Sequence, residues 1–162
     1  MVAGSHIAEL NLGRLRYDIM DPRVADFVNN LNRVNAVAER SPGFVWRLKD
    51  EATGNATQMA VEGNPRLIPN ISVWEDVASL EQFVFQTVHK RFYARRTAWF
   101  QAMDKMHFVM WPVAPGHRPD LPEALDRLDH LNAHGSSDHA FGWDHVPDAQ
   151  IWRSARCDRP AA

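Results

Sequence analysis

The sequence predicts an α+β fold of the ferredoxin-like type, in which helices pack on one face of an antiparallel sheet. Two observations lead to this prediction. Strand and helix patterns follow one another in the order β-α-β-β-α-β, which is the split βαβ plan. A chain of 162 residues, 45% of them hydrophobic, is also long enough to bury one core. We expect a single domain over residues 1–144, ending in a short α-β appendix, and a C-terminal tail over residues 145–162.

Five segments show the alternation or the short apolar run that is typical of a strand. They are residues 6–12, 44–49, 67–74, 106–111 and, as a short final strand, 140–143. Pro69 has no N–H to donate, so its position predicts that the third strand is an edge strand or contains a bulge. In the second strand, we expect Phe44, Trp46 and Leu48 to share one face.

Three segments repeat apolar side chains at helical spacing. They are residues 21–40, 77–103 and 120–134. Asp21 followed by Pro22 is a typical helix start, and Asp120 with Glu123 forms a capping-box pattern. Gly135 stands where a C-terminal cap is expected. We expect the middle segment to be one long, continuous helix.

Both faces of the predicted sheet are apolar, although helices in this plan cover only one of them. In the fourth strand, Phe108 and Met110 alternate with Val109 and Trp111. An exposed apolar face needs a partner. We expect a second copy of the chain to cover it across a two-fold axis, so that the protein is a homodimer and its two sheets form a dimeric α/β barrel.

The composition argues against several classes of protein. The net charge is −2, so no basic field is present to hold nucleic acid or an anionic membrane. The single cysteine, Cys157, excludes an intramolecular disulfide and a cysteine-based metal site. No apolar run is long enough to span a membrane, and the start of the chain lacks the pattern of a signal peptide. We expect a cytoplasmic protein whose partners include neither nucleic acid nor membrane.

The segment 77–103 contains the most informative candidate site. Phe85, His89, Phe92, Arg96 and Trp99 are spaced by four, three, four and three residues, which places them on one stripe of a continuous helix. Imidazole exchanges a proton near neutral pH, and guanidinium holds an enolate, phenolate or carboxylate. One interpretation is a pocket with an aromatic wall, a base and a fixed cation. The other is a half-buried helix whose polar side chains reach structural partners.

Two further polar residues are candidates for the site. Asn11 lies on the opposite side of the first strand from its leucine neighbours, where it either faces a pocket or marks an edge or bulge. His117 follows Gly116 in a proline-rich loop that either covers a pocket mouth or, as we favour, forms a tight turn. The expected substrate-binding wall also includes three tryptophans, which are Trp46, Trp74 and Trp111.

The last predicted helix has histidines and carboxylates about four residues apart. Such spacing allows a divalent metal to bind, but Glu123, Asp126, His130 and His134 fall on the polar side of the helix. We interpret them as a solvated face and expect no metal site.

Several stretches resemble one known bacterial family. They are HIAELN at His6, SPGFVWRL at Ser41, ISVWEDVASLEQFV at Ile71, VHKRFYARRTAWF at Val88, VMWPVAPGHRPDLPEALDRLDHL at Val109 and HAFGWD at His139. The chain resembles the dimeric α/β-barrel superfamily and, within it, the family named domain of unknown function 3291. The superfamily includes antibiotic-biosynthesis-type and haem-degrading monooxygenases, so the resemblance implies oxygenation without a cofactor or a related proton transfer.

The resemblance also suggests roles for two of the candidate residues. In the haem-degrading relatives, an asparagine on the first strand and a histidine on this helix act together with a helical tryptophan. Asn11 and His89 match the first two, whereas Phe83 and Phe85 stand near the position of the tryptophan. This difference weakens the transfer of haem degradation to this chain.

We therefore predict a small-molecule enzyme that is monooxygenase-like, uses no cofactor and acts on an apolar or aromatic substrate. The pocket would lie between the sheet and the second helix. His89 would be the base or acid, Arg96 would hold an anion, and Asn11 would orient the substrate as a hydrogen-bond donor. Two alternatives stay open: a haem protein with His89 as axial ligand, and a non-catalytic module for ligand binding or dimerisation.

Overall fold

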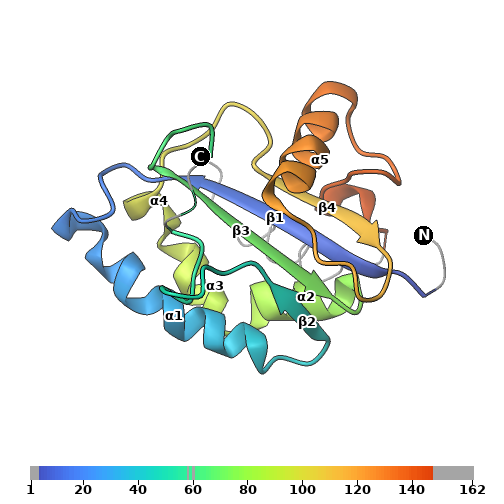
Figure 1. Ribbon diagram of the computed structural model, residues 1–162, viewed down its shortest axis with the longest axis horizontal. Helices are drawn as coiled ribbons and strands as arrows, with labels where there is room; N and C mark the ends of the chain where they lie inside the picture. The colour runs from blue at the N-terminus through green and yellow to red at the C-terminus, as the bar shows by residue number, and fades with distance from the viewer. Residues whose placement is uncertain (1–3, 58, 60, 148–162) are drawn as a thin grey trace.

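Four strands form one antiparallel sheet in the order β2-β3-β1-β4, with helices on both of its faces (Figure 1). The computed structural model describes residues 4–57, 59 and 61–147. The strands are β1 (His6–Arg14), β2 (Phe44–Arg47), β3 (Leu67–Trp74) and β4 (Phe108–Val113). The α-helices are α1 (Ala25–Glu39), α2 (Val77–Gln86), α3 (Val88–Ala94), α4 (Arg96–Trp99) and α5 (Leu121–His134). This arrangement confirms the ferredoxin-like α+β class.

The predicted capping residues act as caps. The side chain of Asp21 accepts a hydrogen bond from the backbone N–H of Arg23 in a 3₁₀ turn, Pro22–Val24, that leads into α1. Asp120 accepts a 2.9 Å hydrogen bond from the backbone N–H of Glu123 at the start of α5. Gly135 ends α5 with a φ of 77°, a conformation that favours glycine.

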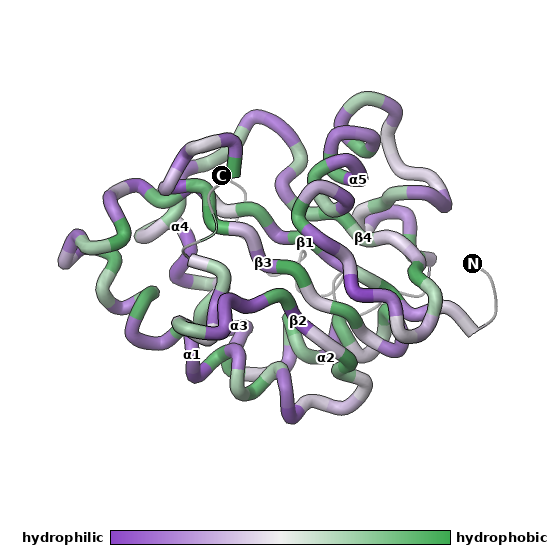
Figure 2. The backbone as a smooth tube through the Cα atoms, in the orientation of Figure 1, coloured by the Kyte–Doolittle hydropathy of each residue, from purple (hydrophilic) through white to green (hydrophobic). Residues whose placement is uncertain are grey.

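Side chains of the central strands alternate between two hydrophobic cores, one on each face of the sheet. The first core, against α5, contains Ala8, Leu10, Leu12, Ile71, Val73, Val109, Trp111, Val113, Ala124, Leu128 and Leu131. The second core, against α1 and α2, contains Ile7, Val34, Ala38, Trp74, Val77, Leu80, Phe83 and Met110. Figure 2 shows hydrophobic and hydrophilic segments alternating along α1 and α5, as amphipathic helices on a core require.

The apolar face that led us to expect a second copy is covered by α5 of the same chain. Leu10 is fully buried, and it belongs to the core that includes Leu128 and Leu131 of α5. The covering helix, α5, follows β4 in the chain. The C-terminal appendix thus covers the face that we expect a second copy to cover. The sheet therefore gives no independent reason for association, and the homodimer stays a prediction.

The prediction of one continuous helix over residues 77–103 is wrong, because the helical conformation is interrupted at two positions. Thr87 is extended (φ −114°, ψ −169°) between α2 and α3. Its hydroxyl donates to the carbonyl oxygen of Phe83 and accepts from the backbone N–H of His89. One threonine thus caps the end of one helix and the start of the next. A second break at Arg95 separates α3 from α4.

Three strand predictions are also corrected. The fourth strand runs over Phe108–Val113 rather than residues 106–111. Residues 140–143 form no strand, because Phe141 makes a single bridge to Met110 before a 3₁₀ turn, Trp143–His145. An irregularity in β2 puts Phe44 and Trp46 in opposite cores.

Pro69 is accommodated because β2 is short. β2 pairs with β3 only at residues 72–74, so Pro69 has β1 as its one strand neighbour. This part of β3 is locally an edge, in agreement with the expectation. It also leaves the end of the sheet open beside α1.

The described part of the chain contains no helix with the length and apolar character that crossing a membrane requires. Val146, just past the expected domain boundary, is buried in the core of α1 and α2. The predicted tail lies outside the described residues beyond position 147, and so does Cys157. The domain division stays a prediction.

A buried polar network connects β1 and β3 beneath α2. Ser72 donates a 2.5 Å hydrogen bond to Oε1 of Glu9, and Nε1 of Trp74 donates to Oγ of Ser72 at 2.9 Å. Glu9 is only 5% exposed. Burial raises the pKa of Glu9 to about 8, against the smaller, opposite effect of the Ser72 hydrogen bond. The folded protein therefore holds Glu9 as a neutral acid at pH 7.

The raised pKa of Glu9 predicts a pH dependence of stability. Unfolding returns the pKa from about 8 towards 4.5, so the unfolded chain releases a proton between these values. Stability should therefore fall as the pH rises through this window, by at most about 1.4 kcal/mol per pH unit. In Glu9→Gln, which stays neutral, urea unfolding between pH 5 and 8.5 should lack this slope. Glu51→Gln, at an exposed position, should behave as wild type. An unchanged slope in Glu9→Gln would contradict the assignment.

Candidate functional site

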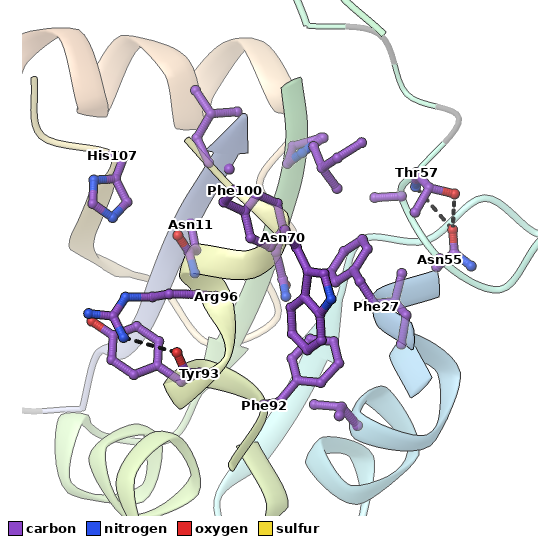
Figure 3. Close-up of a pocket in the computed structure, with 18 of the residues that line it drawn as sticks. Asn11, Phe27, Asn55, Thr57, Asn70, Phe92, Tyr93, Arg96, Phe100 and His107 are labelled. Atoms are coloured by element: carbon purple, nitrogen blue, oxygen red, sulfur yellow. Dashed lines mark hydrogen bonds between the residues drawn. The ribbon is translucent and has the colours of Figure 1, made fainter. Parts of the chain in front are cut away.

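A pocket of about 390 Å³ lies between the open end of the sheet and the helices α1, α3 and α4 (Figure 3). Five of the residues predicted for the site line it together: Asn11, His89, Phe92, Arg96 and Trp99. They come from β1, α3 and α4, and not from the single helix stripe that the spacing predicted. The pocket is thus located between the sheet and the second helical segment, as expected.

Four aromatic rings form the apolar wall of the pocket. Phe27 of α1 contacts Phe92 and Trp99 at centroid distances of 5.5 and 5.9 Å. It also meets Phe100 edge to face at 5.0 Å. Sequence reasoning missed Phe27 and Phe100, because they join the wall from α1 and from the segment after α4. Such a wall suits a planar apolar ligand.

Gly13 of β1 allows Phe100 to lie against the sheet. A Cβ atom at this position would come within 2.5 Å of Cε1 of Phe100. A glycine inside a strand often marks such a close approach, and this was the signal in the sequence that could have located the ring.

His89 is held in one tautomer by a backbone carbonyl. Nδ1 lies 3.2 Å from the carbonyl oxygen of Val84, which only accepts, so the neutral ring carries its proton on Nδ1. Burial lowers the pKa of His89, and the smaller effect of this hydrogen bond opposes it. The unprotonated atom is then Nε2, which has no hydrogen bond to any described residue and is not fully buried. His89 is therefore a neutral base at pH 7.

Arg96 is anchored without a carboxylate. It donates a 3.0 Å hydrogen bond to the carbonyl oxygen of Tyr93, and its Cζ lies 4.0 Å from the centre of the Tyr93 ring. None of the ion pairs in the described ranges involves Arg96. Its charge is thus positioned on the pocket and left for an anion.

Two residues accompany Arg96 at its side of the pocket (Figure 3). Asn11 projects from β1 on the face away from α5, directly opposite Asn70 of β3. His107 lies in the segment that leads into β4, and sequence reasoning missed it. Burial, and then the charge of Arg96, lower the pKa of His107. This end of the pocket therefore combines one cation with groups that are neutral at pH 7.

The other five predicted site residues lie outside this pocket. Trp74 and Trp111 are fully buried in the two cores, and Trp46 packs against the α5 core. Phe85 of α2 contacts Trp143 at a centroid distance of 5.6 Å and is not among the lining residues of the pocket. His117 contacts Glu123 of α5, with 2.7 Å between Nε2 and Oε2, and therefore does not cover the pocket mouth.

The histidines of α5 form a cluster on the surface. The ring of His130 lies 4.5 Å from that of His134 and 4.6 Å from that of His139, between centroids. Across the described part of the chain, no three histidine, cysteine or acidic side chains are arranged to hold a metal ion.

The fold and the pocket define a ferredoxin-like α+β protein with an aromatic-walled, cationic pocket beside its sheet. The family model described as Domain of unknown function (DUF3291) matches residues 6–157, and the chain belongs to this family. The family that the sequence resembles is thus confirmed. No curated protein matches the chain.

Several solved structures are similar to the chain at low sequence identity. SnoaB from Streptomyces nogalater, described as a cofactor-independent oxygenase, is 18% identical with a TM-score of 0.45, covering 74% of this chain and 99% of its own. NE2512 from Nitrosomonas europaea, of unknown function, is 11% identical with a TM-score of 0.48 over the same shares. PA3566 from Pseudomonas aeruginosa is 13% identical with a TM-score of 0.46, covering 72% of this chain and all of its own.

The hydrogen bond of His89 predicts its tautomer and its titration. In long-range ¹H–¹⁵N spectra at pH 7.5, His89 should show the Nδ1–H form. Its midpoint should lie below the ordinary 6.5, because burial disfavours the charged ring. The signal is assigned by its loss in His89→Gln. An Nε2–H ring, or a midpoint above 6.5, would remove His89 as a base.

Proposed function

We propose that the chain is a small-molecule enzyme that removes a proton from an apolar or aromatic substrate and holds the resulting anion. The observation that carries this proposal is the state of His89, a neutral ring that lines an aromatic pocket, with its proton fixed on Nδ1 and no hydrogen bond from Nε2 to any described residue. Nε2 takes the proton from an acidic C–H or O–H group. General-base catalysis of this kind contributes about 10²–10⁴-fold to a rate.

Arg96 and Asn11 act on the charge that the proton transfer creates. The guanidinium of Arg96 forms hydrogen bonds with an enolate or phenolate oxygen, which lowers the energy of the anion in the pocket. The amide of Asn11 donates to the same end of the substrate and orients it. Phe27, Phe92 and Trp99 contact the apolar rings of the substrate.

With dioxygen as the second substrate, the same anion supports a monooxygenase-like reaction without a cofactor. The carbanion transfers electrons to dioxygen, and a C–O bond forms in a hydroperoxide. Loss of water then leaves a ketone, so R₂CH₂ and O₂ give R₂C=O and H₂O. The resemblance to the monooxygenase superfamily supports this step, and the pocket supports the proton transfer that precedes it.

The experiment uses anthrone, a three-ring compound with an acidic CH₂ group, as the probe. Without oxygen, wild-type protein should accelerate exchange of these hydrogens with deuterium in D₂O. With oxygen, it should form anthraquinone. His89→Gln should lose about 10²-fold or more in exchange and still bind the probe, because the glutamine cannot take the proton.

The control is His134→Gln, a change on α5 far from the pocket, which should keep wild-type exchange. Absence of exchange with wild-type protein would defeat the proposal. So would a His89→Gln variant that loses thermal stability and binding in proportion, since His89 would then be structural. Exchange without anthraquinone would remove only the oxygenation step.

The haem alternative uses the same atom and is separated by the same variant. As an axial ligand, Nε2 of His89 should produce a Soret band with one haemin per chain that is lost in His89→Gln. A broad haemin spectrum that the substitution does not change would remove this alternative.

A further inference from the structure

We propose that the pocket binds an elongated aromatic anion with a second, neutral polar group at its far end, and that Asn35 of α1 binds this group. The proposal deepens the proposed function and rests on it for the anionic end at Arg96. The far end is a site that the sequence did not indicate.

Polar side chains lie at two opposite sides of the pocket, with Asn70 of β3 in the middle (Figure 3). Figure 3 shows Asn11, Arg96 and His107 on one side, Asn55 and Thr57 on the other, and the rings of Phe27, Phe92 and Phe100 between them. A ligand that contacts both groups must therefore cross the aromatic wall. A planar ring system with a polar substituent at each end has this shape.

The charged residues of the lining indicate which end of the pocket binds an anion. Among the described residues that line the pocket, Arg16, Arg47 and Arg96 are cations, and none is Asp, Glu or Lys. Arg47 is neutralised by Glu39, with 2.9 Å between Nε and Oε1. Neither Arg16 nor Arg96 takes part in an ion pair of the described ranges, and Nε of Arg16 donates a 2.7 Å hydrogen bond to the carbonyl oxygen of Thr97, which follows Arg96 in the chain. The uncompensated charges thus lie at the Arg96 end, where an anion fits, and the Arg47 end suits a neutral group.

Asn35 lies at this second end and lacks a partner. Asn55 donates a hydrogen bond to Asn32, one turn before Asn35 on α1, and both Asn35 and Asn55 line the pocket. Asn35 is only 8% exposed, yet its amide makes no hydrogen bond within the described ranges. Among the described residues, the amide atoms of Asn35 are not counted with the fully buried polar atoms that lack a partner, so they retain some exposure in a residue that lines the pocket. A ligand in the pocket can therefore reach them.

Two other polar residues of the lining, Arg47 and Asn55, already form hydrogen bonds within the protein. Oδ1 of Asn55 accepts from the Thr57 hydroxyl at 2.6 Å, and the guanidinium of Arg47 donates to the carbonyl oxygen of Gly54 at 2.8 Å. These bonds fix the loop, the hydrogen bond that Asn55 donates to a residue of α1 connects it to that helix, and none of them uses the Asn35 amide, which is left for the ligand. An amide both donates and accepts, so it binds a hydroxyl or a carbonyl.

The experiment compares two probes that differ by one hydroxyl, 2-naphthoate and 6-hydroxy-2-naphthoate. Their dissociation constants are measured by calorimetric titration. For wild-type protein, the hydroxyl should tighten binding about fivefold or more, because it pairs with an otherwise unsatisfied amide. In Asn35→Leu this ratio should fall to about one, with less than a twofold change for 2-naphthoate.

Arg96→Leu should weaken the binding of both probes about tenfold or more, because it removes the contact with the anion. The ratio of the two dissociation constants should stay as in wild type. Asn29→Leu, an exposed asparagine on the same helix outside the pocket, should match wild type in all values. Asn35→Leu should unfold within a few degrees of the wild-type temperature, because the Asn35 amide makes no hydrogen bond within the described ranges. In a second variant, Asn35→Ala, the ratio of the two dissociation constants should also fall to about one.

A wild-type protein that binds neither probe, or shows no hydroxyl preference, would overturn the inference. A preference that survives in Asn35→Leu and Asn35→Ala would overturn it as well. These outcomes can be distinguished from a failure of the proposed function. A protein that fails to exchange the anthrone hydrogens but shows the Asn35-dependent ratio would be a binding module with this same specificity.

Discussion

The alternation of side chains along β1 is the constraint on which both cores and the pocket depend. β1 is paired on both edges, with β3 and β4, and its side chains enter the two cores that lie on opposite faces of the sheet. Leu10 is buried against α5, and this fixes Glu9 and Asn11 on the opposite face. A shift of one residue would move every side chain to the wrong face, burying Asn11 in the apolar core against α5 and placing Leu10 on the face of the pocket. The position of Asn11 in the pocket is therefore a consequence of hydrophobic burial elsewhere.

The break at Thr87 between α2 and α3 determines the tautomer of His89. In a continuous helix, the carbonyl oxygen of Val84 would accept the backbone N–H four residues later. Because α2 ends at Gln86, this oxygen lies in the last turn and accepts from Nδ1 of His89 instead. The same break interrupts the helical stripe, of which Phe92 and Trp99 line the pocket and Phe85 packs on Trp143 instead. One extended residue thus determines the tautomer of the base and the composition of the aromatic surface.

The pocket has a charge distribution opposite to that of the whole chain. The protein carries a net charge of −2, yet the described lining residues include three arginines and no carboxylate. Low solvent exposure strengthens the effect of the uncompensated Arg96 on an anion and lowers the pKa of both histidines of the lining. The result is a cation beside neutral bases, an arrangement in which an acidic substrate is held and a proton acceptor stays available.

The sequence by itself determined the elements that local patterns define. Alternation located β1 and β3, and Asp21, Asp120 and Gly135 marked helix ends, because capping and side-chain period act over a few residues. The family resemblance and the spacing of His89, Phe92, Arg96 and Trp99 located half of the candidate site. Only the tertiary structure decided which face of the sheet α5 covers. It also decided that Trp46, Trp74 and Trp111 pack in or against the two cores and do not line the pocket. Phe27, Asn35, Phe100 and His107 join the site from separate parts of the chain, and their contacts depend on how distant segments pack, which no local pattern encodes.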